Sequence, residues 1–387
     1  MNRRSFLGWM AGAATWGWSQ RVGAQARLDW QPVYQQGLPL NSVHPEKAPD
    51  NVQQALRVAR QHIEAHCTDP EFPNGISHGI RALGRQLPLA TDDPYRTVLQ
   101  TFTEENFLEG QMLLEVPVHR EGHRHALLKT LLEKQCELDL AFELDGRPYT
   151  FADYVRSARL MHTFDLQALD LDEQSWAILA FTRVTPPNQA RWFNIRGQMQ
   201  DLEGILDATS KGLLADTRLV RTVDLRSKEL PRNCDAFARA CGGLHMLYAL
   251  AAALSCAYNK KARQQEFQDH MRTHLRRFTY DMRVIEDVEA LNSERSNAER
   301  AATRAFDGRL KFLGHSLEII GLVDQFDLFT LSGADRDRVD AGRDQLCRWI
   351  SETGSTNLGR YQSDRDLFDS LVTGMCHAYN GLLLSPA

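Results

Sequence analysis

Three short segments of the 387-residue chain hold the cysteine, histidine and glutamate side chains best suited to chemistry. Cys241 and His245 stand four residues apart and His315 and Glu318 stand three apart, so we expect each pair on one face of a helix. Nitrogen and sulfur donors from converging helices suit zinc, and three protein ligands would leave one position open for catalysis. The candidate metal ligands are Cys241, His245, His315, Cys376 and His377, with Glu318 as a further ligand or a general base.

Metal-free acid–base chemistry is the main alternative for the same residues. The three histidines named above are of a type that titrates near neutral pH, and we expect His78 with Arg81 on the same rim. Histidine, tyrosine, arginine and carboxylate groups around a cavity would serve β-elimination or hydrolysis of a glycan. The catalytic candidates are then His245, His315, Glu318, His377 and His78. The simplest alternative is packing, because free cysteines are often buried and histidines can hydrogen-bond neighbouring carbonyls.

The remaining histidines resemble a functional site less closely. Gly122 interrupts the segment HREGHRHALL (119–128), so we do not expect its histidines to converge. His270 and His274 have helical spacing in a segment rich in charge, where we expect a solvated face. His162 ends a helical run, where the helix dipole favours a cation, and it is left out of the candidate site.

From Asn51 onward the main signal is apolar side chains spaced three and four residues apart, which indicates helices. The segments with this spacing are NVQQALRVARQHIEAH, HALLKTLLEKQCEL, EQSWAILAFTRV, RDQLCRWI and DLFDSLVTGMCHAYNGLLL. Strand signals are confined to LEVPVH (114–119) and FELDGRPYTF (142–151), whose Asp-Gly pair predicts a turn. We expect the acidic segment TFTEENFLEG (101–110) to form a solvated helix. The sequence therefore predicts an all-α protein with at most a small β-hairpin.

A coarse internal repeat places a glycine and a histidine near the head of four apolar helices. The segments are NGISHGIRALGRQL, CGGLHMLYALAAAL, FLGHSLEIIGLV and GMCHAYNGLLL, with histidines 78, 245, 315 and 377. The last two intervals, 70 and 62 residues, match the length of one or two helical hairpins. This spacing favours an α/α toroid, an incomplete or full α/α barrel of helical hairpins around a central cavity. Glycine at these positions lets a ligand or a neighbouring backbone approach closely.

The first 26 residues have the features of a twin-arginine export signal. Two arginines (residues 3 and 4) precede Ser-Phe-Leu, an apolar run follows, and an Ala-Gln-Ala cleavage pattern ends at Ala26. We expect export by the twin-arginine machinery, cleavage after Ala26, and a periplasmic or secreted location. Residues 27–50 contain four prolines and are expected to form an extended lead-in, with a single α/α-toroid domain over residues 51–387.

Charge and cysteine content narrow the classes of partner. The formal charge of −5 becomes −8 once the three arginines of the signal are removed, so no basic surface for nucleic acid is expected. Seven cysteines remain, and an odd number in an oxidising compartment leaves at least one without an intramolecular partner. The chain has no G-x-G-x-x-G, P-loop, G-x-S-x-G or C-x-x-C-H motif, which argues against nucleotide, serine-esterase and c-type haem chemistry.

Four segments between about residues 74 and 325 resemble signature segments of a large group of uncharacterised, exported bacterial proteins. They are HGIRALG, DEQSWAILAFTRVTPPNQARWFN, CGGLHMLYAL and GHSLEIIGL, and the CGGLH and GHSLE pieces are the most specific. The resemblance implies an α/α-toroid fold related in shape to terpenoid cyclases and prenyltransferases, and it implies no reaction. The candidate metal set is similar in type to that of lanthionine cyclases, toroids that use two cysteines and a histidine. Their Trp-Cys-Tyr-Gly motif is absent here.

Two functional hypotheses follow from these residues. The first is an exported hydrolase or lyase that acts on a small molecule, glycan or peptide by His/Glu acid–base or zinc-assisted chemistry in a histidine-lined pocket. The second is a periplasmic binding or assembly component whose pocket or rim holds a protein partner. Convergence of His245, His315 and His377 on one pocket favours catalysis. Histidines that point apart beneath an exposed apolar patch favour a partner surface.

Overall fold

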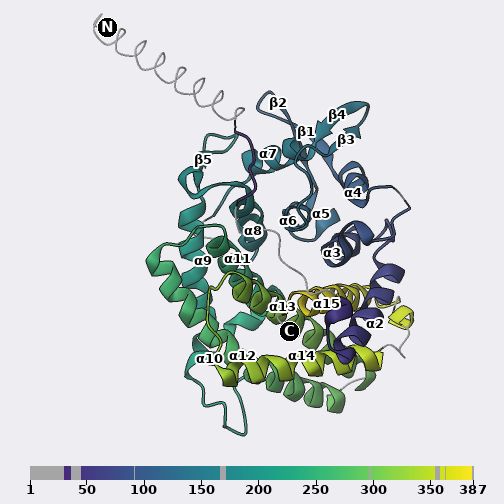
Figure 1. The fold of residues 1–387 in the computed structure, drawn as a ribbon, viewed down its shortest axis with the longest axis vertical. Helices are drawn as coiled ribbons and strands as arrows, with labels where there is room; N and C mark the ends of the chain where they lie inside the picture. Colours follow the sequence, from purple (N-terminus) through teal and green to yellow (C-terminus); the bar gives the residue numbers. More distant parts are fainter. Residues whose placement is uncertain are drawn as a thin grey trace, which may run out of the picture.

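Helices make up 68% of the described residues in a computed structural model (Figure 1). The structure describes residues 30–35, 45–90, 92–165, 171–295, 298–353, 358–361 and 363–385. The expected signal peptide and part of the lead-in lie outside these residues. In the part of the chain that is described, no helix combines the length and the apolar character needed to cross a membrane.

The helical segments predicted from apolar spacing are confirmed. They correspond to α2, α6, α8, α14 and α15 in the structure. The α-helices of the described residues are α2 (Asp50–His66), α3 (Pro73–Leu83), α4 (Pro94–Phe102), α5 (Val118–Glu121), α6 (Ala126–Glu133), α7 (Phe151–Met161), α8 (Gln174–Val184), α9 (Leu202–Asp216), α10 (Arg218–Thr222), α11 (Leu244–Ser255), α12 (Lys261–Arg295), α13 (Ala298–Gln325), α14 (Gly333–Thr353) and α15 (Arg365–Leu384).

Three two-stranded antiparallel sheets accompany the helices, more than the single small hairpin that the sequence predicts. The pairs are β1 (Glu104–Leu108) with β2 (Gln111–Glu115), β3 (Ala141–Leu144) with β4 (Arg147–Thr150), and β5 (Arg191–Phe193) with β6 (Met199–Asp201). The β3–β4 hairpin confirms the predicted Asp-Gly turn, because Asp145 and Gly146 both have positive φ, 46° and 77°. The β5–β6 pair was missed because three-residue strands are too short to show an alternating pattern.

Two local predictions in the region of β1 and β2 are wrong. In the segment TFTEENFLEG (101–110), residues 101 and 102 end α4 and residues 104–108 form β1, so it is not a solvated helix. Glu109 and Gly110 adopt positive φ values of 48° and 79° and turn the chain into β2. The strand predicted over LEVPVH stops at Glu115, since Pro117 interrupts it and Val118 begins α5.

The apolar core runs along a set of helices that pack on one another in turn. Helix α3 contacts α6, α6 contacts α8, and α8 contacts α11. Helix α11 contacts α13, α13 packs along α15, and α15 returns to α3. These helices occupy the middle of Figure 1. Helix α11 is buried over nearly its whole length, as its almost entirely apolar sequence requires.

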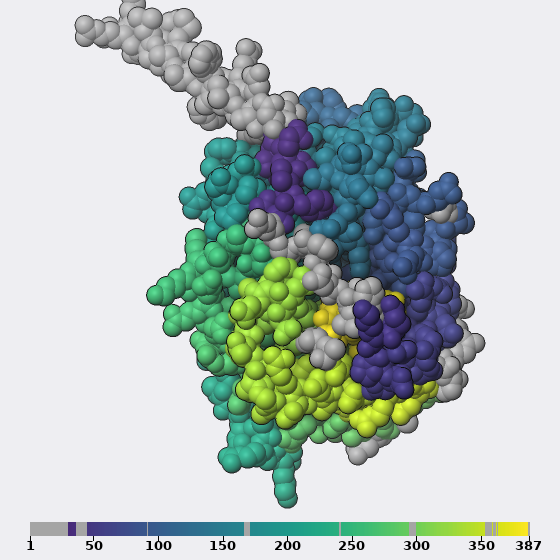
Figure 2. Space-filling model, viewed as in Figure 1, coloured from purple at the N-terminus to yellow at the C-terminus, as the bar shows by residue number. Residues whose placement is uncertain are grey.

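Helices α2 and α14 lie outside this set and cover one side of it. They contact each other, and α2 also packs on α15. Figure 2 shows α2, in dark purple-blue, beside the yellow-green α14 on the outer face. The N-terminal part of the described chain therefore covers the helices nearest its C-terminal end.

Helices α13 and α15 touch backbone to backbone at glycine. A β-carbon built on Gly314 would lie 2.6 Å from the carbonyl carbon of His377, and one on Gly381 would clash with the Gly314 backbone. Gly321 meets Leu384 in the same way. The expected role of glycine in close approach is therefore confirmed for a neighbouring backbone, and it draws His315 and His377 to the same level of the core.

Candidate metal and acid–base centre

Four histidines from four helices meet in the core, and we call them the histidine centre: His78, His245, His315 and His377. The rings of His315 and His377 have centroids 3.7 Å apart, and those of His245 and His315 are 4.5 Å apart. His78 lies edge-on to His377 at 5.0 Å. The structure therefore brings together the four histidines that the sequence singled out, although they are 62 or more residues apart along the chain.

The predicted position at helix heads is correct for His245 but wrong for two others. His245 is the second residue of α11, whereas His315 and His377 lie in the interiors of α13 and α15. The residues before His315, AERAATRAFDGRLKFLG, contain good helix formers and no proline, so α13 begins at Ala298 and continues through the glycine.

Cys241 reaches the centre by a different route from the predicted helix face. Cys241, Gly242 and Gly243 all have positive φ, 46°, 65° and 72°, so a left-handed turn precedes α11. This conformation is easy for glycine but costs energy at Cys241. Its sulfur nevertheless lies within 4.8 Å of one ring nitrogen each from His245 and His315. Cys241 is also the one half-buried cysteine, while the other six are buried.

Cys376 lies away from the candidate metal ligands. Its sulfur is 3.6 Å from the sulfur of Cys67, at the C-terminal end of α2, and both residues are buried. Adjacent residues on a helix point about 100° apart, so Cys376 and the neighbouring His377 face different directions from α15. Cys376 belongs to neither group of donors close enough to hold a common ion among the described residues.

Hydrogen bonds fix which nitrogen carries the proton in two of the rings. His315 Nδ1 lies 3.0 Å from a Glu318 oxygen, and because a carboxylate only accepts, the proton is on Nδ1. His315 Nε2 is therefore a lone pair, and it is buried without a hydrogen-bond partner in the described structure. Arg81 donates to His377 Nδ1 at 2.7 Å, so His377 carries its proton on Nε2.

Glu318 is a fully engaged carboxylate. It accepts from Arg81 at 2.8 Å and from Asn380 at 2.8 Å in addition to His315. Burial opposes its ionisation, but the Arg81 guanidinium and His315 outweigh burial and hold the pKa of Glu318 well below its usual value. Burial and the neighbouring imidazoles lower the pKa of His245 well below its ordinary value, so this ring is neutral at pH 7.

Two overlapping sets of donor atoms lie close enough to hold a metal: Cys241 with His245 and His315, and His315 with Glu318 and His377. The second set is the poorer site, because the Arg81 guanidinium bonds both Glu318 and His377 and would repel a cation. The first set offers a sulfur and two neutral imidazoles, a zinc-type combination. Glu318 then accepts a hydrogen bond from His315 Nδ1 and orients the ring, as carboxylates commonly do for metal-binding histidines.

Several charged residues of the centre were missed from the sequence. Lys129 and Glu133 on α6 and Arg183 on α8 are buried beside Arg81, and Glu133 pairs with all three cations. A signal for two of them exists, because Lys129 and Glu133 stand four apart inside the otherwise apolar helix ALLKTLLE. A buried charge in such a segment requires a partner. Arg81 was expected near His78, and the structure confirms their common helix.

The histidines outside the centre are arranged partly as predicted. His123 stacks on Trp176, while His125 points to His162 at 3.0 Å, so the histidines of residues 119–128 do not converge. The expected solvated face at His270 and His274 is wrong, since both are buried. His162 is also buried, and burial lowers its pKa well below the ordinary value, so it is not the helix-capping cation expected.

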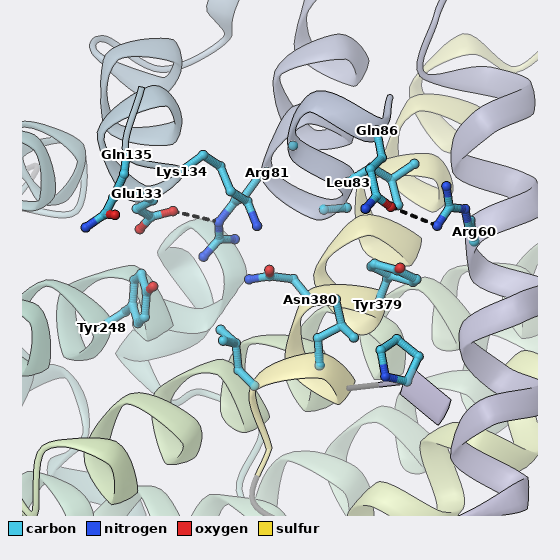
Figure 3. Close-up of a pocket in the computed structure, with 15 residues that line it drawn as sticks. Arg60, Arg81, Leu83, Gln86, Glu133, Lys134, Gln135, Tyr248, Tyr379 and Asn380 are labelled. Carbon is cyan, nitrogen blue, oxygen red and sulfur yellow. Dashed lines mark hydrogen bonds and ion pairs between the residues drawn. The ribbon is translucent and has the colours of Figure 1, made fainter. Parts of the chain in front are cut away.

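Arg81 also lines a cavity of about 430 Å³ (Figure 3). Arg81, Glu133, Tyr248 and Asn380 face this space in the close-up, together with Tyr379. None of the four histidines lines it. Arg81 and Asn380 both bond Glu318, so they form a layer between the cavity and the histidine centre.

No protein family, no curated protein and no solved structure matches the chain. The residues and their geometry are therefore the basis for any functional conclusion.

Proposed function

We propose that the protein is an exported hydrolase or lyase with a zinc ion held by Cys241, His245 and His315. The observation that carries the proposal is the His315 Nε2 lone pair. It is buried and has no hydrogen-bond partner in the described structure, and a ring nitrogen of His315 lies with the Cys241 sulfur and a His245 nitrogen inside a 4.8 Å limit. Donors bound to one tetrahedral zinc are about 3.5 Å apart, so a small closure around the ion completes the site.

The protonation states of the donors also support zinc. Burial raises the pKa of the Cys241 thiol to about 12, so the free thiol is protonated at neutral pH and gives up its proton when metal binds. His245 and His315 have lowered pKa values, chiefly through burial, and are already neutral, as metal ligands must be. Glu318 holds His315 in the tautomer that exposes Nε2.

The surrounding side chains supply the remaining parts of an acid–base centre. Zinc would supply Lewis acidity at the open position. His377 carries its proton on Nε2 because Arg81 occupies its Nδ1, and this Nε2–H would serve as a donor to a developing negative charge. His78 donates Nδ1–H to the Asn74 carbonyl at 2.8 Å, which leaves a lone pair on Nε2 as an acceptor.

The protein reaches its compartment, in this proposal, through the twin-arginine pathway, with cleavage after Ala26. The support is the Arg-Arg-Ser-Phe-Leu segment and the Ala-Gln-Ala pattern. We also propose that α3, α6, α8, α11, α13 and α15 form the inner helices of an α/α toroid related to the group with CGGLH and GHSLE segments. The successive contacts of these helices support that arrangement.

Elemental analysis of the natively exported protein tests the metal site. We expect about one zinc per chain in the wild type and in Cys376→Ala, a matched control whose sulfur lies beside Cys67. Cys241→Ser and His315→Ala should lose most of the zinc while keeping the wild-type circular dichroism. Equal zinc in all four proteins, or none in any after reconstitution with zinc, would contradict the metal assignment.

A panel of chromogenic esters, amides and glycosides tests the enzymatic part of the proposal. We expect turnover of at least one class, lost in His315→Ala and in protein stripped with a chelator. Full turnover after complete zinc removal would mean that the activity comes from metal-free acid–base chemistry at His315 and His377. Zinc-loaded protein that turns over none of the classes would instead favour the non-enzymatic binding or assembly component.

A further inference from the structure

The cavity of Figure 3 borders an excess of buried positive charge, of which the proposed reaction uses Arg81 alone. Arg81, Lys129 and Arg183 are at most 4% exposed, and Lys134 is half-buried at the edge of the cavity. Among the residues that the structure describes, the carboxylates in ion pairs with these cations are Glu133 and Glu318. Four cations against two anions leave two positive charges uncompensated.

The ion pairs show where the excess charge lies. Glu133 is shared between Arg81 at 3.1 Å, Lys129 at 2.9 Å and Arg183 at 3.1 Å. The Lys134 ammonium has no ion pair or hydrogen bond with any described residue. A cation withdrawn from water without a partner is costly, so this cavity favours a negatively charged occupant.

Neutral donors in the cavity wall fit the same occupant. The Tyr248 hydroxyl is buried and has no hydrogen-bond partner in the described structure, and Asn380 keeps its carbonyl and amide group at the cavity edge. Gln135 and Tyr379 also line the wall. These groups can orient an acceptor oxygen beside Lys134 without adding charge.

The remainder of the wall is largely apolar, with Leu83, Leu383, Leu384 and Pro45 in it. Arg60 also lines it, but its guanidinium is engaged by Glu64 and Gln86. A volume of about 430 Å³ is within the range of small-molecule sites. Arg81 has no free pair of donors for a bidentate phosphate, because its three nitrogens bond Glu133, His377 and Glu318. One unpaired ammonium, Lys134, beside a largely apolar wall suits a carboxylate on an apolar body better than a hydrated inorganic anion.

We propose that this cavity is a second binding site, separate from the histidine centre, for a small organic carboxylate. The carboxylate pairs with Lys134 and accepts from Tyr248, and its apolar body lies against Leu383 and Leu384. This proposal does not depend on zinc or on catalysis at the histidine centre.

Isothermal titration calorimetry with full-length protein tests the site. The probes are 3-phenylpropanoate, octanoate, benzoate and indole-3-acetate, with the amide of each as a neutral control and inorganic phosphate as a competing anion. We expect at least one carboxylate to bind at least tenfold more tightly than its amide. Failure of all four carboxylates to bind, equal affinity for acid and amide, or tighter binding of phosphate would each overturn the proposal.

Matched variants locate the binding. Lys134→Met should weaken carboxylate binding at least tenfold, and Leu383→Trp should block it by filling the cavity. Lys211→Met, which removes an exposed lysine from α9, should leave binding unchanged. Carboxylate binding that survives both cavity variants would overturn the assignment. Zinc content should be unchanged in Lys134→Met, so failure here is distinguishable from failure of the metal site.

Discussion

The backbone of Gly314 on α13 lies directly against the backbone of His377 on α15, with no room for a β-carbon between them. This contact sets the distance between the two helices that supply His315 and His377. Because the contact is between main chains, no side-chain rotation can relieve added bulk there.

Gly314→Ala should therefore destabilise the protein, by about 2 kcal/mol, and separate the histidine rings. Its matched control is Gly308→Ala on the same helix, where an added β-carbon meets its nearest atom, on Ile285, at an ordinary 3.7 Å. The control should be neutral or stabilising by up to about 1 kcal/mol, because alanine is the better helix former. Urea unfolding measures both, and equal stabilities for the two variants would refute the close contact.

Thiol labelling should distinguish Cys241 from the other cysteines. Cys241 is half-buried while the other six are buried, so N-ethylmaleimide should modify native protein first at Cys241. Its raised pKa makes the reaction slow at neutral pH. Added zinc should protect the thiol, as peptide mass spectrometry would show. Labelling of Cys376 or Cys67 ahead of Cys241, or no protection by zinc, would argue against the site.

Stability should fall steeply as the pH drops below about 6.5. Burial lowers the pKa of His125 and of His274 to about 3, so each binds a proton more weakly in the folded state than in the unfolded state. Their contribution is complete above the unfolded pKa of about 6.5 and is lost as the pH falls from there toward 3. At pH 5 the loss is about 2 kcal/mol for each histidine.

Urea unfolding at pH 5 and pH 7.5 measures this dependence. His274→Leu should flatten it, since the ring packs near Phe278 and Phe312 and its nitrogens have no hydrogen-bond partner in the described structure. His119→Gln, at an exposed position, should leave the wild-type dependence intact. A His274→Leu protein with the full wild-type pH dependence would show that this ring does not contribute.

Carboxylate binding in the cavity should weaken at alkaline pH. Burial lowers the pKa of Lys134 to about 8, with Glu133 opposing the shift, so the ammonium is charged below pH 8 and neutral above it. Affinity should fall at least fivefold between pH 7 and pH 9, and the fall should be smaller in Lys134→Met. Calorimetry at the two pH values measures it, and affinity that rises with pH would contradict the assigned charge.

Glu318→Gln tests the support of His315. An amide in place of the carboxylate can donate a hydrogen bond to His315 Nδ1. The ring proton would then sit on Nε2, which would no longer have a lone pair for the metal. We expect zinc affinity to fall by about 10- to 100-fold. Glu299→Gln, near the N-terminal end of the same helix, is the control and should retain wild-type affinity. A competition titration with a fluorescent zinc chelator measures both variants, and unchanged affinity in Glu318→Gln would contradict the role of Glu318.

The sequence predicted which histidines meet in the candidate site better than it predicted the backbone conformation that positions the cysteines. Spacing identified His315 with Glu318, because both stand on one regular helix. The position of Cys241 depends on a left-handed turn that spacing along a helix cannot describe, and Cys376 was grouped with His377 although neighbours on a helix face different ways. Glu133 and Lys129 were missed because their meaning depends on burial, which arises only when α3, α6 and α8 pack together.

Arg81 donates to His377 and also lines the cavity. Because the same guanidinium contacts the histidine centre and the cavity, binding at one site would affect binding at the other. Arg81 also bonds Glu318, which holds His315. An anion that changes these bonds would therefore change the free energy of the zinc binding that we propose. Reciprocity then requires zinc to change the affinity for the anion by the same factor. One buried side chain would thus set the coupling free energy between the two sites.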